Sequence, residues 1–186
     1  LLDKNFLLIL RMDQTPTGWR VRQLVNSPEL VRQFREAQVE RMTAQRQMIL
    51  DRNAATEKRM KELFPLQPCS ASAGLISDGN TLLVVVHVLA RNIGTVSVNN
   101  MNLFTNLSSA SGEPLLTRYL NAVQPTHPGE DFERNWTIEL DGNSELGRRV
   151  LNGQPLQCKA AWKTLGLNNG EVLHISEAPA PIEEFQ

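Results

Sequence analysis

Residues 81–107, TLLVVVHVLARNIGTVSVNNMNLFTNL, form the stretch that decides the fold. Side chains alternate between the two faces of a strand, and residues 82–90 place apolar side chains on both faces. The β-branched valines, with turn residues at 78–80 and 92–94, favour a strand over a helix. We therefore predict a central strand that is buried on both faces, followed by strands in which apolar residues alternate with polar ones.

The sequence beyond this stretch repeats the strand pattern several times. From Phe132 to Asp141, apolar residues alternate with polar ones, and only Arg134 breaks the apolar side. About seven short strands separated by turns predict an antiparallel β-sandwich over residues 66–177. The remaining predicted strands are residues 69–75, 156–163 and 171–175, while residues 115–123 fit either a strand or a short helical turn.

Three features of this region carry a resemblance to known domains. They are a valine-rich strand ending at Ala90-Arg91-Asn92, the Gly94 and Val96 that follow it, and a Pro128-Gly129 turn before Phe132. With these features the region resembles the immunoglobulin-like domains of bacterial envelope proteins, of the FxLYD type and the late-embryogenesis type. The resemblance implies an immunoglobulin-like β-sandwich in the cell envelope.

A long helix is predicted ahead of the sandwich. Ser27 fits the cap position, Pro28 fits the first helical turn, and no glycine or proline follows until Pro65. The helix is therefore expected over residues 28–64, a length of about 55 Å. Its surface is polar and its apolar stripe is thin and broken, so it is either a spacer or one strand of a weak coiled coil.

The first residues predict a β-hairpin over residues 6–25, with turn chemistry at 13–18. The Gly18-Trp19-Arg20-Val21 strand that runs into a helix resembles the end of a small curved-sheet domain of the cystatin or NTF2 type. An isolated hairpin is marginal in water, so this hairpin needs partners. It either adds to another sheet, dimerises, or is the remnant of a preceding domain.

The predicted organisation is of the α+β class, in four parts. Residues 1–26 form the hairpin, 27–65 the helix, 66–177 the β-sandwich and 178–186 a disordered tail rich in proline and glutamate. The chain has 186 residues, of which 41% are hydrophobic, and no apolar run approaches the ~18 residues that cross a bilayer. A net charge of −1 gives no long-range attraction to nucleic acid. Since the sequence begins at Leu1 rather than Met, we expect any membrane contact to come from a segment upstream.

Cys69 and Cys158 are the only cysteines, and their separation excludes a CxxC redox or zinc motif. Both fall on the inward side of predicted strands. Two interpretations remain: a disulfide that closes a loop of about ninety residues, or two buried thiols that act as small apolar residues. A disulfide would mean that the protein is exported, because the cytosol keeps thiols reduced.

The sequence contains no catalytic, metal or nucleotide signature. His87, His127 and His174 are widely separated, and none has a partner at metal-ligand spacing. We expect no enzyme activity, no cofactor and no metal. The candidate contacts for a partner or ligand are Trp136, Trp162 and Phe104.

Two functions fit these patterns. The first is a non-enzymatic interaction or structural module of the cell envelope, exported to the periplasm, which binds a protein through the sandwich. The helix or the hairpin would then space the module or assemble it into a homo-oligomer. The second is a ligand- or glycan-binding β-sandwich, in which a tryptophan lies exposed in a groove.

Overall fold

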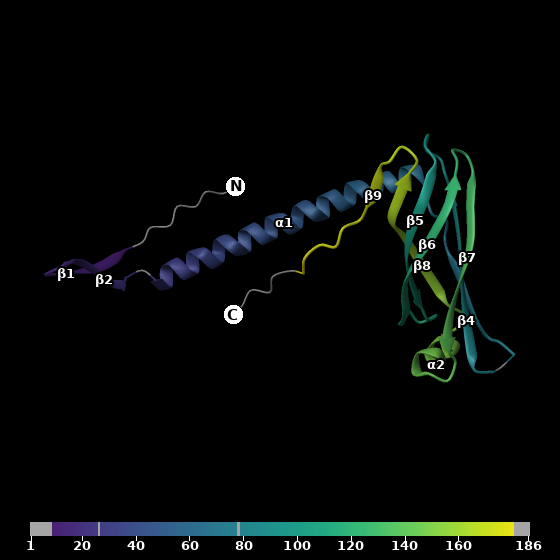
Figure 1. Ribbon diagram of the computed structural model, residues 1–186. Helices are drawn as coiled ribbons and strands as arrows, with labels where there is room; N and C mark the ends of the chain where they lie inside the picture. The colour runs from purple at the N-terminus through teal and green to yellow at the C-terminus, as the bar shows by residue number, and fades with distance from the viewer. Residues whose placement is uncertain (1–8, 26, 78, 181–186) are drawn as a thin grey trace. The chain divides into compact units, whose positions relative to one another are not determined.

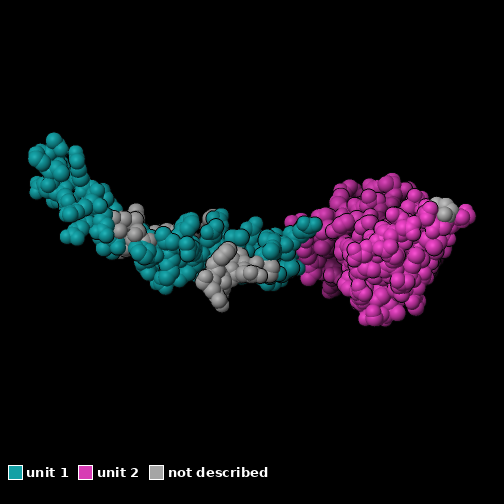
Figure 2. All heavy atoms as spheres, turned by 90° about the horizontal axis from the view of Figure 1, so that it is seen from below, with its two compact units in different colours: residues 1–51, 177–186 teal, residues 52–176 magenta. Residues whose placement is uncertain are grey.

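The structure is a computed structural model that describes residues 9–25, 27–77 and 79–180. It combines α1 (Ser27–Leu63), the short helix α2 (Glu145–Asn152) and three antiparallel sheets (Figure 1). The chain divides into two compact units (Figure 2). One unit comprises residues 1–51 with 177–186, and the other comprises residues 52–176.

The first sheet is the predicted hairpin, in which β1 (Leu10–Thr15) pairs with β2 (Gly18–Leu24). Thr15 Oγ1 donates to Gly18 O over 2.6 Å and closes the turn. Gly18 has a φ of 132°, a backbone conformation that side chains with a Cβ rarely adopt. These residues explain why the chain reverses at this point.

Helix α1 matches the predicted helix to within one residue at each end. It ends where the loop between β4 and β5 meets it: the amides of Ile93 and Gly94 both donate to Leu63 O. A Cβ at Gly94 would lie 2.6 Å from the Leu63 side chain, so the close approach of loop and helix needs glycine. The helix therefore ends on a defined partner rather than in solvent.

Two larger sheets follow the helix. The three-stranded sheet has the order β3-β4-β7, and the four-stranded sheet has the order β6-β5-β8-β9. The segment that fitted either a strand or a helical turn is a strand, because it pairs along its length with β5. The strand bounds are β3 (Ser70–Leu75), β4 (Thr81–Arg91), β5 (Val98–Ser108), β6 (Pro114–Thr126), β7 (Asp131–Asp141), β8 (Gln157–Leu167) and β9 (Val172–His174).

Strand β4 alternates between a fully buried face and a half-buried one. The face from Leu82 to Ala90 is at most 1% exposed, whereas the face from Thr81 to Leu89 is half-buried. The prediction of burial on both faces is therefore wrong. β4 is the middle strand of a three-stranded sheet, and only one face of that sheet lies on the hydrophobic core.

Both larger sheets contribute to one hydrophobic core. Phe64, the first residue after α1, stacks on Trp162 of β8 at 5.2 Å between ring centroids and lies 6.0 Å from Phe132 of β7. The Trp162 Nε1 donates to Phe64 O over 2.7 Å, so the buried indole is satisfied. The end of α1 thus closes the core between the two sheets.

Helix α2 was not predicted. Ser144 caps it, since its Oγ accepts a hydrogen bond from Gly147 N over 2.9 Å, and Glu145 lies at the positive end of the helix. This cap was the signal in the sequence. The segment is short and lies between two strands, so it has no extended helical repeat of apolar residues that would have marked it as a helix.

Candidate functional site

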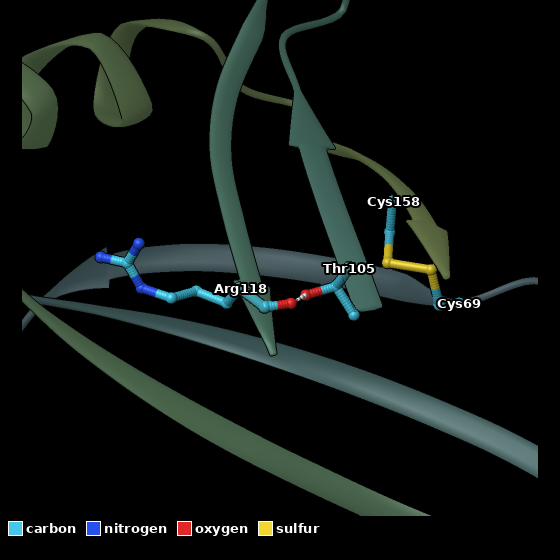
Figure 3. Close-up of a disulfide and its surroundings, with 4 residues drawn as sticks. All are labelled: Cys69, Thr105, Arg118 and Cys158. Carbon is cyan, nitrogen blue, oxygen red and sulfur yellow. Dashed lines mark hydrogen bonds between the residues drawn. A yellow bond between two sulfur atoms is a disulfide. The ribbon is translucent and has the colours of Figure 1, made fainter. Parts of the chain in front are cut away.

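Cys69 and Cys158 form a disulfide, with Cα atoms 5.6 Å apart (Figure 3). Cys69 precedes β3 and Cys158 lies in β8, so the bridge ties the three-stranded sheet to the four-stranded one. Of the two interpretations left open by the sequence, the disulfide is confirmed. Figure 3 also shows Thr105 Oγ1 donating to Arg118 O over 3.1 Å, a bond between β5 and β6. The disulfide indicates an oxidising, exported environment.

The three histidines lie in three separate places. Each is hydrogen-bonded to one polar side chain, and none shares a partner with another histidine. The described residues contain no group of three or more His, Cys, Asp or Glu side chains that could hold a metal ion. The three pairs are His87 Nε2 with Glu133 Oε1 at 3.0 Å, His127 Nδ1 with Ser97 Oγ at 2.9 Å, and His174 Nδ1 with Thr164 Oγ1 at 2.9 Å.

The candidate contact residues lie in different environments. Trp162 is 6% exposed in the core, so its ring offers no surface to a partner. Trp136 is half-buried; its Nε1 donates to Asn121 O, and the Arg134 guanidinium lies 5.8 Å from its ring centroid. This cation–π contact accounts for the one charged residue on the apolar side of β7.

Phe104 belongs to the outer face of the four-stranded sheet. It is half-buried and pairs with the exposed ring of Tyr119 across β5 and β6, with 5.2 Å between ring centroids. A shallow depression lies near this pair and is formed by β5, β6 and β8. Its lining residues include Asn100, Asn102, Asn121, Val123 and Thr164.

The hairpin exposes several large apolar side chains. Cross-strand partners share a face of a hairpin, and Met12 pairs with Val21 while Gln14 pairs with Trp19. Trp19 is 64% exposed and Val21 is 58% exposed on this face. The hairpin is a sheet of only two strands, and this mainly apolar face, which also carries Gln14, is not covered by another strand of the described chain.

The first turns of α1 are a solvated ionic surface. Arg32 donates two hydrogen bonds to Glu29 and thereby lowers the pKa of the Glu29 carboxyl, with a further bond from Gln33. The same contact raises the pKa of Arg32. Both groups lie at the surface, where ion pairs contribute little to stability. This part of α1 is built to remain in water.

No helix in the described part of the chain has the length and apolar content to span a membrane. No family model matches the sequence. No curated protein matches it either.

Several solved structures resemble the fold in part. A Northeast Structural Genomics Consortium target has 10% identity and a TM-score of 0.40, covering 68% of this chain and 95% of that one. A protein from Archaeoglobus fulgidus has 18% identity and a TM-score of 0.37, covering 61% of this chain and 89% of that one. The Salmonella enterica trimeric lipoprotein SadB has 16% identity and a TM-score of 0.27, covering 82% of this chain and 88% of that one. These similarities identify neither a family nor a function for the chain.

Proposed function

We propose that this chain is a non-enzymatic interaction and structural module of the cell envelope, exported to the periplasm. In this proposal the two larger sheets form an immunoglobulin-like β-sandwich, and α1 acts as a spacer. The exposed apolar face of the hairpin carries the proposal. The shared core of the two sheets and the disulfide between them support the sandwich architecture.

The hairpin face is the proposed site of self-association. A two-stranded hairpin is marginal in water, because its few hydrogen bonds and one apolar face do not offset the entropy of ordering the chain. A second copy of the same face would bury the apolar side chains around Trp19 and Val21 on both chains. The opposite face carries Arg11, Asp13 and Arg20 and would stay in water.

The edge of the four-stranded sheet is the proposed surface for a different protein. β6 is an edge strand, since β5 is its only neighbour in the sheet. Tyr119 and Val123 lie exposed on it, and Val123 is 81% exposed. An extended peptide can add to such an edge through main-chain hydrogen bonds, with exposed side chains giving specificity.

Val21→Asp tests the self-association. We expect the wild-type chain to be an oligomer by analytical ultracentrifugation. The dissociation constant of the variant oligomer should be about tenfold higher, because association would bury a carboxylate in an apolar contact. Gln23→Asp is the matched control, since Gln23 pairs with Arg11 on the opposite face of the same strand. Equal masses for the wild type and both variants would count against the proposal.

A second function is favoured by one observation, the aromatic pair Phe104 and Tyr119 near the amide-lined depression of Asn100, Asn102 and Asn121. Stacking rings beside amide donors and acceptors suit a sugar or another small polar ligand. In this case titration with neutral oligosaccharides should shift the tyrosine fluorescence of the wild type. Tyr119→Ala should abolish the binding, and Tyr119→Phe should retain most of it. A flat titration at millimolar sugar would remove this alternative.

A further inference from the structure

The outer face of the four-stranded sheet is built from rows of side chains that cross the neighbouring strands β6, β5 and β8 (Figure 1). Residues directly opposite each other in antiparallel strands share a face, and successive rows on one face lie two residues apart, which is about 7 Å. The aromatic pair Tyr119 and Phe104 forms one row. The row next to it consists of Thr117 on β6, Asn106 on β5 and Lys159 on β8.

The side-chain amide of Asn106 is held in one orientation. Thr117 Oγ1 donates to Asn106 Oδ1 over 2.6 Å, and Asn106 itself is exposed. An amide side chain has one acceptor oxygen and a nitrogen with two N–H donors. The bond from Thr117 occupies the oxygen, and no residue of the described chain accepts a hydrogen bond from the nitrogen. Asn106 therefore offers Nδ2, a donor, to a ligand on this face.

Lys159 provides a second donor beside the first. It is the cross-strand partner of Asn106, and side chains at such positions start about 5 Å apart. Lys159 is exposed, and its ammonium forms no ion pair with a carboxylate of the described residues. A carboxylate accepts several hydrogen bonds at once, and those from charged donors are the stronger ones. An amide N–H and an ammonium side by side therefore suit a carboxylate.

The strands of this sheet carry no negative charge of their own. β5, β6, β8 and β9 all lie within the described residues and contain no aspartate or glutamate. The carboxylates that flank these strands, Glu113 and Glu171, are paired with Arg149 and Arg59. An anion on this face thus meets no carboxylate that would repel it. The other larger sheet differs, since its strand β7 contains Asp131, Glu133, Glu139 and Asp141.

We infer that this face binds an acidic oligosaccharide, with a sugar ring on Phe104 and Tyr119 and a carboxylate of the sugar on Asn106 and Lys159. Phe104 lies opposite Ala161, two residues from Lys159, and such diagonal neighbours are about 7–8 Å apart, within reach of long side chains. One ligand can therefore contact both rows. This assignment rests on the sugar binding proposed above for the aromatic pair, to which it adds the charge of the ligand.

Titration of the full chain with an oligogalacturonate and with its methyl ester tests the charge. The two probes share their sugar rings, and only the first carries carboxylates. Isothermal titration calorimetry should show the acid form binding about threefold to tenfold more tightly at low salt, as expected for one exposed ion pair with a hydrogen bond. This preference should disappear at about 1 M salt, where the charges are screened. Equal affinities at low salt would leave the aromatic sugar site in place and overturn the assigned role of Asn106 and Lys159. No binding of either form would overturn both.

Substitutions on the two outer faces test the position of the site. Lys159→Gln should weaken binding of the acid form about threefold to tenfold and leave the methyl ester unchanged. Arg91→Gln is the matched control, because it removes one exposed positive charge from β4 of the other sheet, where Arg91 lies 3.8 Å from Asp131. It should leave both affinities unchanged. Tyr119→Ala should abolish binding of both forms. An equal loss in Lys159→Gln and Arg91→Gln, or full binding of the acid form by Tyr119→Ala, would show attraction by net charge alone and contradict the inference.

Discussion

Replacing Phe64 by alanine is expected to lower the free energy of unfolding by about 3–5 kcal/mol. Phe64 is fully buried, stacks on Trp162 and contacts Phe132, so its removal leaves a cavity between the two larger sheets. The substitution keeps Phe64 O, which accepts from Trp162 Nε1, so the loss should come from packing and not from an unpaired polar group. Urea denaturation followed by tryptophan fluorescence measures the change.

Phe34→Ala is the matched control for this prediction. It removes the same kind of side chain, this time from within α1, but Phe34 is 61% exposed, and the expected loss is below about 1 kcal/mol. Comparable losses for the two variants would mean that Phe64 does not close the core as described. Phe64→Leu should recover part of the stability, because it refills much of the cavity.

Loss of the disulfide is expected to cost about 4 kcal/mol on chain-entropy grounds. The bridge joins residues 89 positions apart, and its removal frees a long loop in the unfolded chain. The double variant Cys69→Ala with Cys158→Ala should therefore unfold at lower urea than the oxidised wild type. Measuring both proteins with and without dithiothreitol separates the effect of the bond from that of the two substitutions.

The double variant provides the control, because dithiothreitol should leave its unfolding midpoint unchanged. The wild type in dithiothreitol should move toward the midpoint of the double variant. A wild type whose thiols are shown to be free by mass spectrometry, and whose midpoint has not moved, would contradict the assigned role of the bridge. Such a result would mean that side-chain packing, and not the disulfide, stabilises the core.

Local sequence patterns predicted most of the strands and α1, because alternation and capping are local signals. Ser27-Pro28 and the absence of glycine and proline up to Pro65 were sufficient for the helix. The pairing of Cys69 with Cys158 was left open, since two inward thiols far apart in sequence can be joined or separate. Only the packing of the three-stranded sheet against the four-stranded sheet brings the two sulfur atoms within bonding distance.

The candidate surface was only partly predictable. Periodicity placed both Trp136 and Trp162 on inward sides, and only the three-dimensional arrangement shows that Trp162 lies deeper, on the Phe64 ring. The hydrogen bond between Asn53 of α1 and Ser176 could not be predicted from local sequence, because the two residues are 123 positions apart. A proline- and glutamate-rich stretch reads as disordered unless its partner is known.

The junction between α1 and the β4–β5 loop has a mechanical consequence. Asn92 Nδ2 donates to Val96 O within the loop and to Thr126 O at the end of β6, and its Oδ1 accepts from Gly94 N, so the loop that holds Leu63 O is itself braced. A tensile load that reaches the last turn of α1 is shared by these bonds. We therefore expect these hydrogen bonds to break together at a single force when the chain is pulled, and the last turn of α1 not to unfold before them.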